Sequence, residues 1–423
     1  MHICKGYFIL PFERKGFDMF LSVHEASSKL GISIDTIRRW EKKGLIKATR
    51  SDKNHRMFND SEILNLVNKL NNKSEQEFTV LKNKKKTKYT AIELFAGAGG
   101  TALGFENAGI NHVLLNEIDK DCVSTLINNF GLATNVIGGD VRKLDFKKWK
   151  GKVDIVQAGF PCQAFSYAGK SMGFEDTRGT LFFEFARCVK EVQPKIAIGE
   201  NVKGLLKHDN GKTLQTMVNT LKELGYKVKY RVLRAQYLDV PQKRERVIII
   251  AIRNDLDIPF IFPKEKNYTV SLRAALKDCP KSECQYYSKR KTEILSHVPE
   301  GGYWRDLPID LQKEFMGASF YQTGGRTGMA RRLSWDEPSL TLTCSPAQKQ
   351  TERCHPSETR PLSVREYARI QSFPDNWVFS GSIGSKYKQI GNAVPVNLAY
   401  HIGRCVIAML DGDNDVKDAI IEQ

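Results

Sequence analysis

A short apolar run that ends in a tight turn is the feature that most constrains this fold. Residues 153–156 read Val-Asp-Ile-Val and predict a buried parallel strand, and residues 159–170 follow as GFPCQAFSYAGK. Pro161 stiffens the turn that presents Cys162, because proline fixes its own backbone angle. Open α/β sheets bind their ligands at the carboxyl ends of such strands. The pattern therefore predicts an α/β sheet in which Cys162 is either an exposed nucleophile or a packed structural cysteine.

The same strand-and-turn pattern occurs earlier in the chain with glycine in the turn. Residues 91–95 predict a strand, residues 96–100 (AGAGG) a tight turn, and residues 101–108 a helix. Glu117 and Asp140 stand where two further strands are expected to end. A glycine turn lets a nucleoside approach the backbone and an acid can accept from ribose hydroxyls, so the pattern fits NAD as well as S-adenosylmethionine. The competing interpretation is that both acids only cap helices.

Two later strands also have charged residues at one end. Residues 195–199 lead into Glu200, and residues 247–252 form a strongly apolar run that follows Arg244 and Arg246. Because side chains alternate along a strand, the two arginines are expected to share one face at the start of that strand. Unpaired cations are costly to bury, so we expect these arginines to have partners or a function.

The charge and cysteine content narrow the function classes. The chain has 65 Lys and Arg against 48 Asp and Glu, a net charge of +17, which indicates a polyanionic partner and favours nucleic acid over a membrane surface. The longest early apolar stretch, residues 6–12, is too short for a secretory segment, so we expect a soluble cytoplasmic protein. Nine cysteines without a CxxC pair favour reduced thiols. No metal is expected, since the nearest ligand group, Cys344, Cys354 and His355, matches no common zinc module.

Residues 19–71 have the character of a helix-turn-helix domain and follow a leader of residues 1–18. Apolar residues at helical spacing lie on both sides of Gly31, and a basic segment comes after them. The stretch resembles the MerR type of winged helix, which implies an all-α domain whose second helix enters the major groove of DNA. The residues expected to contact DNA are then Thr36, Arg38, Arg39 and Arg56. The alternative is that these residues only form a charged, solvated face of the domain. The next segment, residues 72–88, is predicted to be a basic linker.

Six motifs occur together in the rest of the chain. They are FAGAGG, GFPCQAFS, ENVKGL, QKRERV, RPLSVREYARIQSFP and QIGNAVPVNLA. In this order and spacing the chain resembles the DNA (cytosine-5) methyltransferases from residue 89 to about residue 403. The resemblance implies the α/β class, with a Rossmann-like sheet that binds S-adenosylmethionine and a small DNA-reading domain. The expected divisions are a catalytic domain over residues 89–260, a target-recognition domain over residues 261–365, and a return to the catalytic domain over residues 366–423.

The resemblance also implies a role for individual residues. Cys162 matches the catalytic cysteine, Glu200 the carboxyl that meets the cytosine ring nitrogen, and Arg246 the arginine near the ring carbonyl, with Arg244 beside it. The expected cofactor-binding residues are Phe95, Ala96, Gly97, Gly99, Glu117, Asp140, Pro161, Asn392 and Ala393. The family often has serine where Ala393 stands, so a hydroxyl contact is missing at that position. The expected DNA contacts of the target-recognition domain are Arg331, Arg332, Thr341 and Thr343.

The function implied by the resemblance is methylation of carbon 5 of cytosine in duplex DNA, through a covalent Cys162 adduct and an extruded base. A restriction-modification system with a cognate endonuclease, monomeric catalysis and regulation of the enzyme's own gene are the expected context. One alternative is a tRNA cytosine-5 methyltransferase, but a groove-reading helix does not suit the deep major groove of RNA. The other is a transcriptional regulator whose catalytic domain only binds the cofactor.

Overall fold

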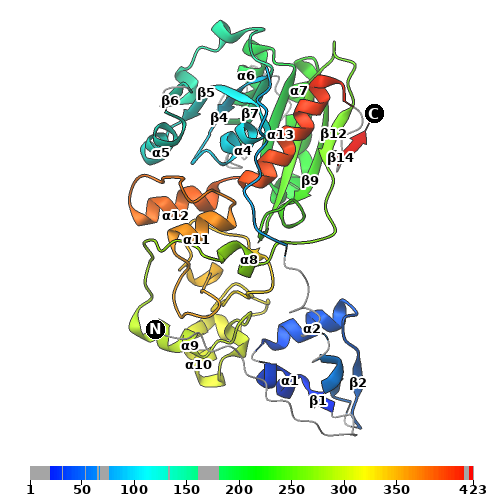
Figure 1. Cartoon of the computed structure of the whole chain (residues 1–423), viewed down its shortest axis with the longest axis vertical. Helices are drawn as coiled ribbons and strands as arrows, with labels where there is room; N and C mark the ends of the chain where they lie inside the picture. The colour runs from blue at the N-terminus through cyan, green and yellow to red at the C-terminus, as the bar shows by residue number, and fades with distance from the viewer. Residues whose placement is uncertain are drawn as a thin grey trace. The chain divides into compact units, whose positions relative to one another are not determined.

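The computed structural model describes residues 20–30, 32–52, 54–63, 66, 76–131, 134–160, 181–413 and 419–422 (Figure 1). The chain forms two compact units. One comprises Met1–Ser74 and Pro299–Gly302, and the other comprises Glu75–Val298 and Tyr303–Gln423. Pro161 and Cys162 lie outside the described residues, so their roles stay predictions from the sequence.

The N-terminal unit combines two helices with a small antiparallel sheet. Helix α2 (Ile34–Lys42) follows helix α1 (Val23–Leu30), and the Ser33 hydroxyl caps α2 by accepting from the backbone N–H of Thr36. The strand order of the sheet is β1 (Phe20–Ser22), β3 (Arg56–Asn59) and β2 (Ala48–Arg50). The expected basic wing is therefore a β-hairpin, β2–β3, and the domain is mixed α and β because these strands complete its core.

The larger unit is built on a seven-stranded sheet in which all neighbouring strands are parallel except β11. The strands, in their order across the sheet, are β6 (Val136–Gly138), β5 (Asn111–Glu117), β4 (Thr90–Leu94), β7 (Ile155–Ala158), β8 (Ile196–Val202), β11 (Glu245–Arg253) and β9 (Tyr226–Arg234). Strand β11 runs antiparallel to both neighbours, with Arg246 opposite Val202. The first residues of β11 therefore lie at the same edge as the last residues of β4 to β8.

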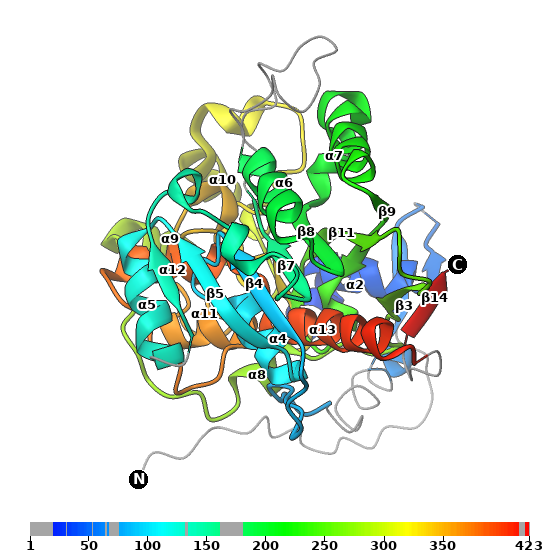
Figure 2. The same cartoon turned by 90° about the horizontal axis from the view of Figure 1, so that it is seen from above.

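Helices cover both faces of this sheet, as Figure 2 shows from above. Helices α4 (Gly100–Ala108) and α13 (Val396–Asp411) cover one face, and α6 (Leu181–Val192) and α7 (Lys212–Glu223) the other, while α5 (Lys120–Phe130) packs beside β5 and β6. A Cβ atom on Gly104 would lie 2.4 Å from the Ala399 Cβ, so glycine lets α4 and α13 touch. Residues 383–411 contain an 18-residue stretch that is long and apolar enough to cross a membrane. However, 78% of that stretch is buried in the protein, as in a core helix.

The remaining elements of this unit form a smaller, irregular region below the sheet in Figure 1. Its helices are α8 (Leu272–Leu276), α9 (Lys289–Ser296), α10 (Ile309–Met316), α11 (Val364–Ile370) and α12 (Ile383–Asn392), and β10 (Gln242–Lys243) pairs with β13 (Ser339–Leu340). Strand β12 (Phe260–Pro263) pairs with β14 (Ala419–Glu422) beside α13. Leu272 and Leu342 share one apolar cluster with Tyr367 and Tyr387, so the core continues across the expected domain boundary at residue 365.

The described part of the predicted linker, residues 76–88, is fixed to the larger unit, and we call it the strap. The Leu81 N–H donates to Asn397 Oδ1 (2.9 Å), and the Asn83 N–H donates to the Asn107 carbonyl (2.7 Å). Further along, the Thr87 N–H donates to the Gly109 carbonyl (2.8 Å). The strap therefore belongs to the larger compact unit, Glu75–Val298 and Tyr303–Gln423.

Candidate active site

Two of the predicted catalytic residues meet at the carboxyl edge of the sheet. Glu200 lies near the end of β8 and Arg246 near the start of β11, and their side chains form an ion pair with Arg246 Nε 2.7 Å from Glu200 Oε1. The two side chains are 13% and 12% exposed, so the pair is largely withdrawn from water but still reachable. Strand direction explains the meeting, since antiparallel pairing brings the start of β11 beside the end of β8.

The strand that leads to Cys162 ends beside this ion pair. A Cβ atom placed on Gly159 would lie 3.3 Å from Glu200 Oε2, and the buried Asn201 amide donates to the Phe160 carbonyl at 2.9 Å. Asn201 thus ties the turn after β7 to the end of β8. The sequence analysis missed Asn201, although it stands directly after Glu200 in the ENVKGL motif.

Arg244 lies just outside the regular strand that contains Arg246. Strand β10 ends at Lys243 and β11 begins at Glu245, so Arg244 occupies the break between them. Its guanidinium is buried and donates to the carbonyls of Leu342 (3.3 Å) and Gly391 (3.1 Å). Burial lowers the pKa of Arg244 to about 9. Arg244 therefore supports the loop carbonyls from the break between the two strands, whereas Arg246 pairs with Glu200.

The glycine turn after β4 is held by the acid at the end of β5. Glu117 Oε2 accepts from the Gly97 N–H (2.8 Å), and Glu117 Oε1 accepts from the N–H groups of Ile118 (2.8 Å) and Asp119 (2.9 Å). Phe95 and Gly97 both have positive φ angles, 58° and 55°, which bends the chain sharply after the strand. Because a carboxylate can accept several bonds, Glu117 can hold the turn and still receive a ribose hydroxyl.

Asp140 follows β6 at the same edge of the sheet. Its carboxylate accepts from Arg142 Nε (3.0 and 2.9 Å) and from the Arg142 backbone N–H (3.0 Å), and these bonds lower the pKa of Asp140 to about 2. Asp140 is thus an ionised acceptor at neutral pH. Next to Glu117, Ile118 is 67% exposed and offers an apolar surface that the sequence analysis missed. The sequence indicates Ile118 only by its position, as an apolar residue directly after Glu117 at the end of a strand.

The return motif near the C-terminus lies against the glycine turn. A Cβ atom on Gly100 would lie 2.2 Å from the Val394 carbonyl oxygen and 3.3 Å from the Ala393 Cβ. Ala393 is buried, and its carbonyl accepts from the Gln371 amide (3.0 Å). Asn392 is exposed, and its Oδ1 accepts from the Cys344 thiol (3.1 Å). The structure therefore brings together the described members of the predicted cofactor set: Phe95, Ala96, Gly97 and Gly99 on the turn, Glu117 and Asp140 after the next two strands, and Asn392 and Ala393 on the return motif.

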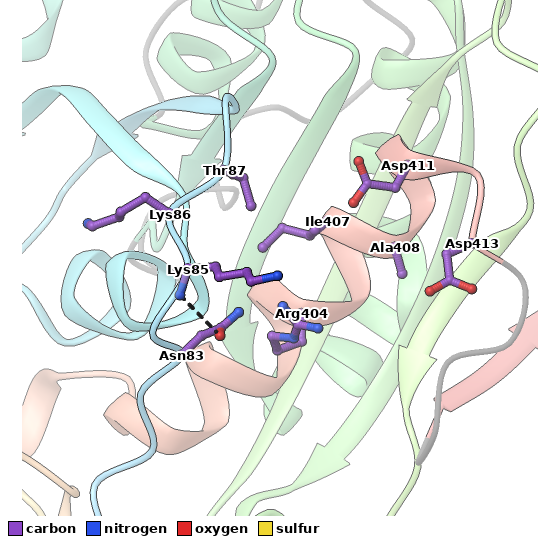
Figure 3. A pocket seen from close by; sticks show the side chains of 9 residues that line it. All are labelled: Asn83, Lys85, Lys86, Thr87, Arg404, Ile407, Ala408, Asp411 and Asp413. Atoms are coloured by element: carbon purple, nitrogen blue, oxygen red, sulfur yellow. Dashed lines mark hydrogen bonds between the residues drawn. The ribbon is translucent and has the colours of Figure 1, made fainter.

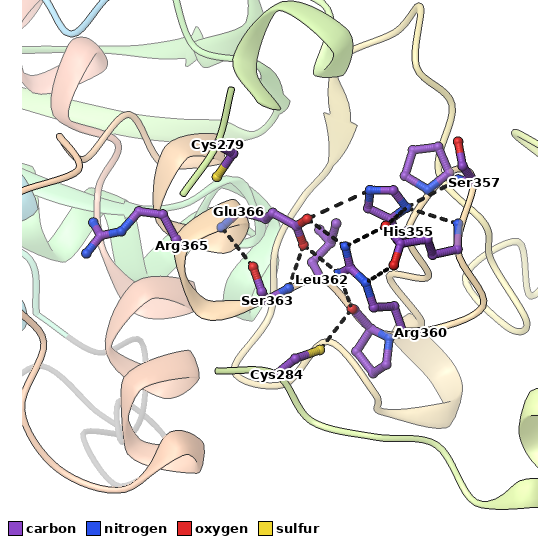
Figure 4. Close-up of polar contacts among 12 residues, drawn as sticks. Cys279, Cys284, His355, Ser357, Arg360, Leu362, Ser363, Arg365 and Glu366 are labelled. Carbon is purple, nitrogen blue, oxygen red and sulfur yellow. Dashed lines mark hydrogen bonds and ion pairs between the residues drawn. The ribbon is translucent and has the colours of Figure 1, made fainter. Parts of the chain in front are cut away.

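The RPLSVREYARIQSFP motif stabilises α11 through a buried polar network (Figure 4). Arg360 donates through both terminal nitrogens to the Glu366 carboxylate (2.8 Å each), and the Ser363 N–H donates to the same carboxylate at 2.7 Å. His355 Nε2 lies 3.8 Å from Glu366 Oε1, whereas the Cys344 thiol contacts Asn392. Among the described residues, no group of three or more His, Cys, Asp or Glu could hold a metal ion.

The arginines predicted to read DNA from residues 331 and 332 are buried. Arg332 is 4% exposed and donates to the carbonyls of Leu295 (2.8 Å) and Val298 (2.7 Å). Arg331 is 8% exposed, donates to the Thr327 carbonyl (2.8 Å) and lies over the Tyr303 ring. These side chains satisfy loop carbonyls, so the prediction that they contact DNA is contradicted by their burial.

Thr341 and Thr343 are half-buried and also bond inward. The Thr341 hydroxyl donates to the Lys243 carbonyl (2.5 Å), and the Thr343 hydroxyl donates to the Ser345 carbonyl (3.0 Å). Their hydroxyls hold the segment that follows β13, next to β10. A contact between these threonines and DNA stays a prediction.

The helix-turn-helix residues divide into exposed and buried ones. Thr36 is 7% exposed, and its hydroxyl lies 3.0 Å from the Ser33 hydroxyl, so it belongs to the cap of α2 rather than to a DNA-facing surface. Arg38 is exposed on α2, Arg39 Nε lies 3.5 Å from Asp35 Oδ2, and Arg56 Nε lies 3.2 Å from Glu41 Oε1. Lys42 is also exposed on α2. Lys42 is a basic residue in the last turn of α2, and the sequence analysis does not include it among the expected DNA contacts.

Known proteins are similar to this chain along most of its length. The family model of the C-5 cytosine-specific DNA methylases matches residues 89–408, and that of the MerR family regulatory proteins matches residues 22–58. The type II methyltransferase M.Eco47II of Escherichia coli is 55% identical over 403 residues, which cover 93% of this chain and 96% of the relative. The type II methyltransferase M.HhaI of Haemophilus parahaemolyticus is 37% identical over 331 residues, which cover 76% of this chain and 97% of the relative.

The fold is also found among solved structures. A DNA modification methyltransferase encoded within an Escherichia coli prophage aligns with a TM-score of 0.56 at 23% identity, covering 76% of this chain and 99% of that one. The DNMT2 protein of Spodoptera frugiperda aligns with a TM-score of 0.54 at 19% identity, covering 75% and 99%. These two likenesses concern the fold, whereas the family model spans most of the chain. The chain therefore belongs to the C-5 cytosine-specific DNA methylase family, as an enzyme that uses S-adenosylmethionine.

Proposed function

We propose that Cys162, Glu200 and Arg246 carry out methyl transfer to carbon 5 of cytosine in duplex DNA. The observation that supports this assignment is the Arg246–Glu200 ion pair at the edge of the sheet, beside the turn that leads to Cys162. The pair presents one carboxyl and one guanidinium to the same small space. That combination suits a ring which carries an acceptor nitrogen next to a carbonyl.

Cytosine needs covalent activation before it accepts a methyl group. Carbon 5 is a poor nucleophile, and addition of the Cys162 thiolate to carbon 6 turns it into an enamine-like carbon. Negative charge then develops on ring nitrogen 3 and the carbonyl oxygen. Glu200, when protonated, donates to the nitrogen, and Arg246 donates to the oxygen. After methyl transfer, loss of the carbon-5 proton and departure of the Cys162 sulfur restore the aromatic ring.

The base has to leave the duplex to reach these groups. The ion pair lies at the end of buried strands, and a stacked base would not reach its atoms. Extrusion costs a few kcal/mol of lost stacking. The closeness of Gly159 to Glu200 leaves little room there, so a larger residue in place of Gly159 would crowd the carboxyl that meets the ring.

The residues around the glycine turn fit S-adenosylmethionine. When bound, it supplies a methyl group on a positively charged sulfur. Glu117 offers a fixed carboxylate for the ribose hydroxyls, and Asp140 offers an ionised carboxylate for the adenine amine. Phe95 lies at the start of the turn and is half-buried, and the exposed Ile118 offers an apolar surface for the adenine ring. The Gly100–Val394 contact closes the other side of this space.

The cellular setting is that of a bacterial restriction-modification system. The similar proteins are named type II methyltransferases, which supports a cognate endonuclease that acts on the same site. We place the enzyme in the cytoplasm, where its substrate DNA is, acting as a monomer. The MerR-like unit presents Arg38 and Lys42 on α2 and Arg50 on the wing, which supports binding of a DNA site near its own gene.

The direct experiment is to incubate the full-length protein with bacterial DNA and labelled S-adenosylmethionine, and then to map 5-methylcytosine at base resolution. We expect one short sequence to be methylated in duplex DNA, with no label on tRNA. Cys162→Ala should abolish the label, and Cys279→Ala, which changes a cysteine away from the sheet edge, should keep it. Label on tRNA alone, or methylation by Cys162→Ala, would contradict the proposal.

A further inference from the structure

The strap carries a row of exposed lysines at the edge of the sheet opposite the catalytic residues. Its last residues lead directly into β4, and it is bonded to Gly109, which precedes β5. Both positions mark the amino ends of parallel strands, whereas Glu117 and Glu200 stand near the carboxyl ends. The lysines of this row are Lys82, Lys84, Lys85, Lys86 and Lys88.

The backbone of the strap is held rigidly enough to present these lysines in fixed places. The Gly109 carbonyl accepts from both the N–H (2.8 Å) and the hydroxyl (2.9 Å) of Thr87. A Cβ atom on Gly109 would lie 2.7 Å from the Lys85 carbonyl oxygen, so the strap is in close contact with the loop after α4. Asn397 anchors the other end by donating to Thr79 and accepting from Leu81, at 2.9 Å each. Fixed charges lose less conformational freedom on binding than charges on a free linker.

A pocket of about 390 Å³ lies between the strap and α13 (Figure 3). Lys85 and Arg404 line it and point into the same part of it, whereas Lys86 is turned away and lies 3.5 Å from Glu106. Within the described part of the chain, neither the Lys85 ammonium nor the Arg404 guanidinium has a hydrogen bond or ion pair. Two unpaired cations that face one space repel each other, and an anion between them would remove that repulsion.

Carboxylates close the far end of the pocket. Asp411 lies on α13 seven residues after Arg404, about 10 Å along the helix, and its Oδ1 accepts from the Tyr89 hydroxyl (2.6 Å). Asp413 lines the same end. An anion is therefore favoured only at the Lys85 and Arg404 end, next to the exposed row of strap lysines.

We infer that Lys85 and Arg404 form a phosphate-binding site for the backbone of a second segment of duplex DNA, and that Lys82, Lys84 and Lys88 extend the contact along the strap. The repeated charges favour a polymer of phosphates over a single free phosphate, which the pocket alone would satisfy. Because the sheet separates the two edges, this DNA segment differs from the one that occupies the catalytic edge. The inference goes beyond the proposed function and needs no methyl transfer for its test.

The test is the salt dependence of binding by the full-length protein to a long duplex of arbitrary sequence. The double variant Lys85→Gln with Arg404→Gln is compared with Lys222→Gln with Lys227→Gln, which removes the same charge from exposed lysines near the end of α7 and the start of β9. Each lost phosphate contact lowers the slope of log K against log salt by about 0.9, so we expect a loss of about 2 in the strap variant. The control variant should keep the wild-type slope, and both should keep the wild-type melting temperature.

Two outcomes would overturn the inference. One is an equal change of slope in both double variants, which would show a general effect of net charge. The other comes from an arm with inorganic phosphate at constant ionic strength. If calorimetry shows that the strap variant loses binding of inorganic phosphate while its salt slope for DNA equals that of the wild type, the pocket holds a free phosphate ion and not the DNA backbone. A lower salt slope for DNA in the strap variant alone supports the DNA contact.

Discussion

The charged residues of the sheet edge and those of the smaller, irregular region of the same unit have opposite relations to the fold. Glu200 and Arg246 stand at the ends of regular strands, pair with each other and stay partly exposed. Arg332 is 4% exposed and bonds to carbonyls of the surrounding loops. In a sheet, neighbouring strands supply the hydrogen-bond partners of each other's backbone groups. Charged side chains at the strand ends are therefore not needed for that purpose and can contact a ligand. Loop carbonyls have no neighbouring strand to donate to them, so buried arginines such as Arg332 supply the donors.

The largest effect is expected from Glu200→Gln. The amide cannot pass a proton to ring nitrogen 3, so the rate of methyl transfer should fall about 10²- to 10³-fold. Glu245→Gln is the matched control, because Glu245 is a neighbouring carboxylate that pairs with the exposed Lys203. Single-turnover methylation measures both variants. Equal rates for them would remove Glu200 from the chemistry.

Arg332→Met tests whether the buried arginine stabilises the fold through its bonds to loop carbonyls. Several loop carbonyls lose a charged donor, so the free energy of unfolding should drop by about 3 kcal/mol. Denaturant unfolding measures the loss. Unchanged stability combined with weaker DNA binding would show instead that Arg332 turns outward to DNA.

Arg244→Met and Arg246→Met separate support from chemistry within a single motif. Arg244 bonds to Leu342 and Gly391, so its loss should cost about 2 kcal/mol of stability. Arg246 faces Glu200, so its loss should reduce the methylation rate more than the stability. Parallel unfolding and kinetic measurements compare the two variants, and the same profile for both would show that the arginines act as one unit.

The smallest effect is expected in the N-terminal unit. Arg38→Gln removes one exposed cation from α2 and should weaken binding of promoter DNA about tenfold, whereas Thr36→Val changes a buried hydroxyl and should mainly destabilise the helix cap. Gel-shift titration on the DNA upstream of the gene gives both values. A larger binding defect in Thr36→Val would place that residue on the DNA side.

The sequence predicts best those parts of the molecule that depend on local pattern. The apolar runs before Gly97, Cys162 and Glu200 are strands in the sheet, and each predicted strand end lies at one edge because parallel neighbours share direction. The meeting of the glycine turn with Ala393 follows from the family resemblance, because no local pattern links residues that far apart. The positions of Glu200, Glu117 and Asp140 near strand ends are thus within reach of sequence reasoning.

The features that the sequence does not predict all depend on contacts between segments that lie far apart in the chain. The alternation of side chains does not apply to Arg244, because the strand breaks at that residue and its side chain bonds to Leu342 and Gly391. The sequence does not reveal how the strap is held, because its bonds to Asn107 and Asn397 leave no periodic signal. Arg332 was expected at the surface for the same reason, since its acceptors come from loops that only the fold brings together.

The central claim is that Cys162 attacks carbon 6 of an extruded cytosine beside Glu200 and Arg246. The most direct measurement uses bacterial DNA in which 5-fluorocytosine replaces cytosine, incubated with the full-length protein and S-adenosylmethionine. Fluorine on carbon 5 cannot leave as a proton does, so the adduct should persist, and mass spectrometry of the digested complex should find the base on Cys162. A complex linked through another cysteine, or no covalent complex at all, would contradict the account.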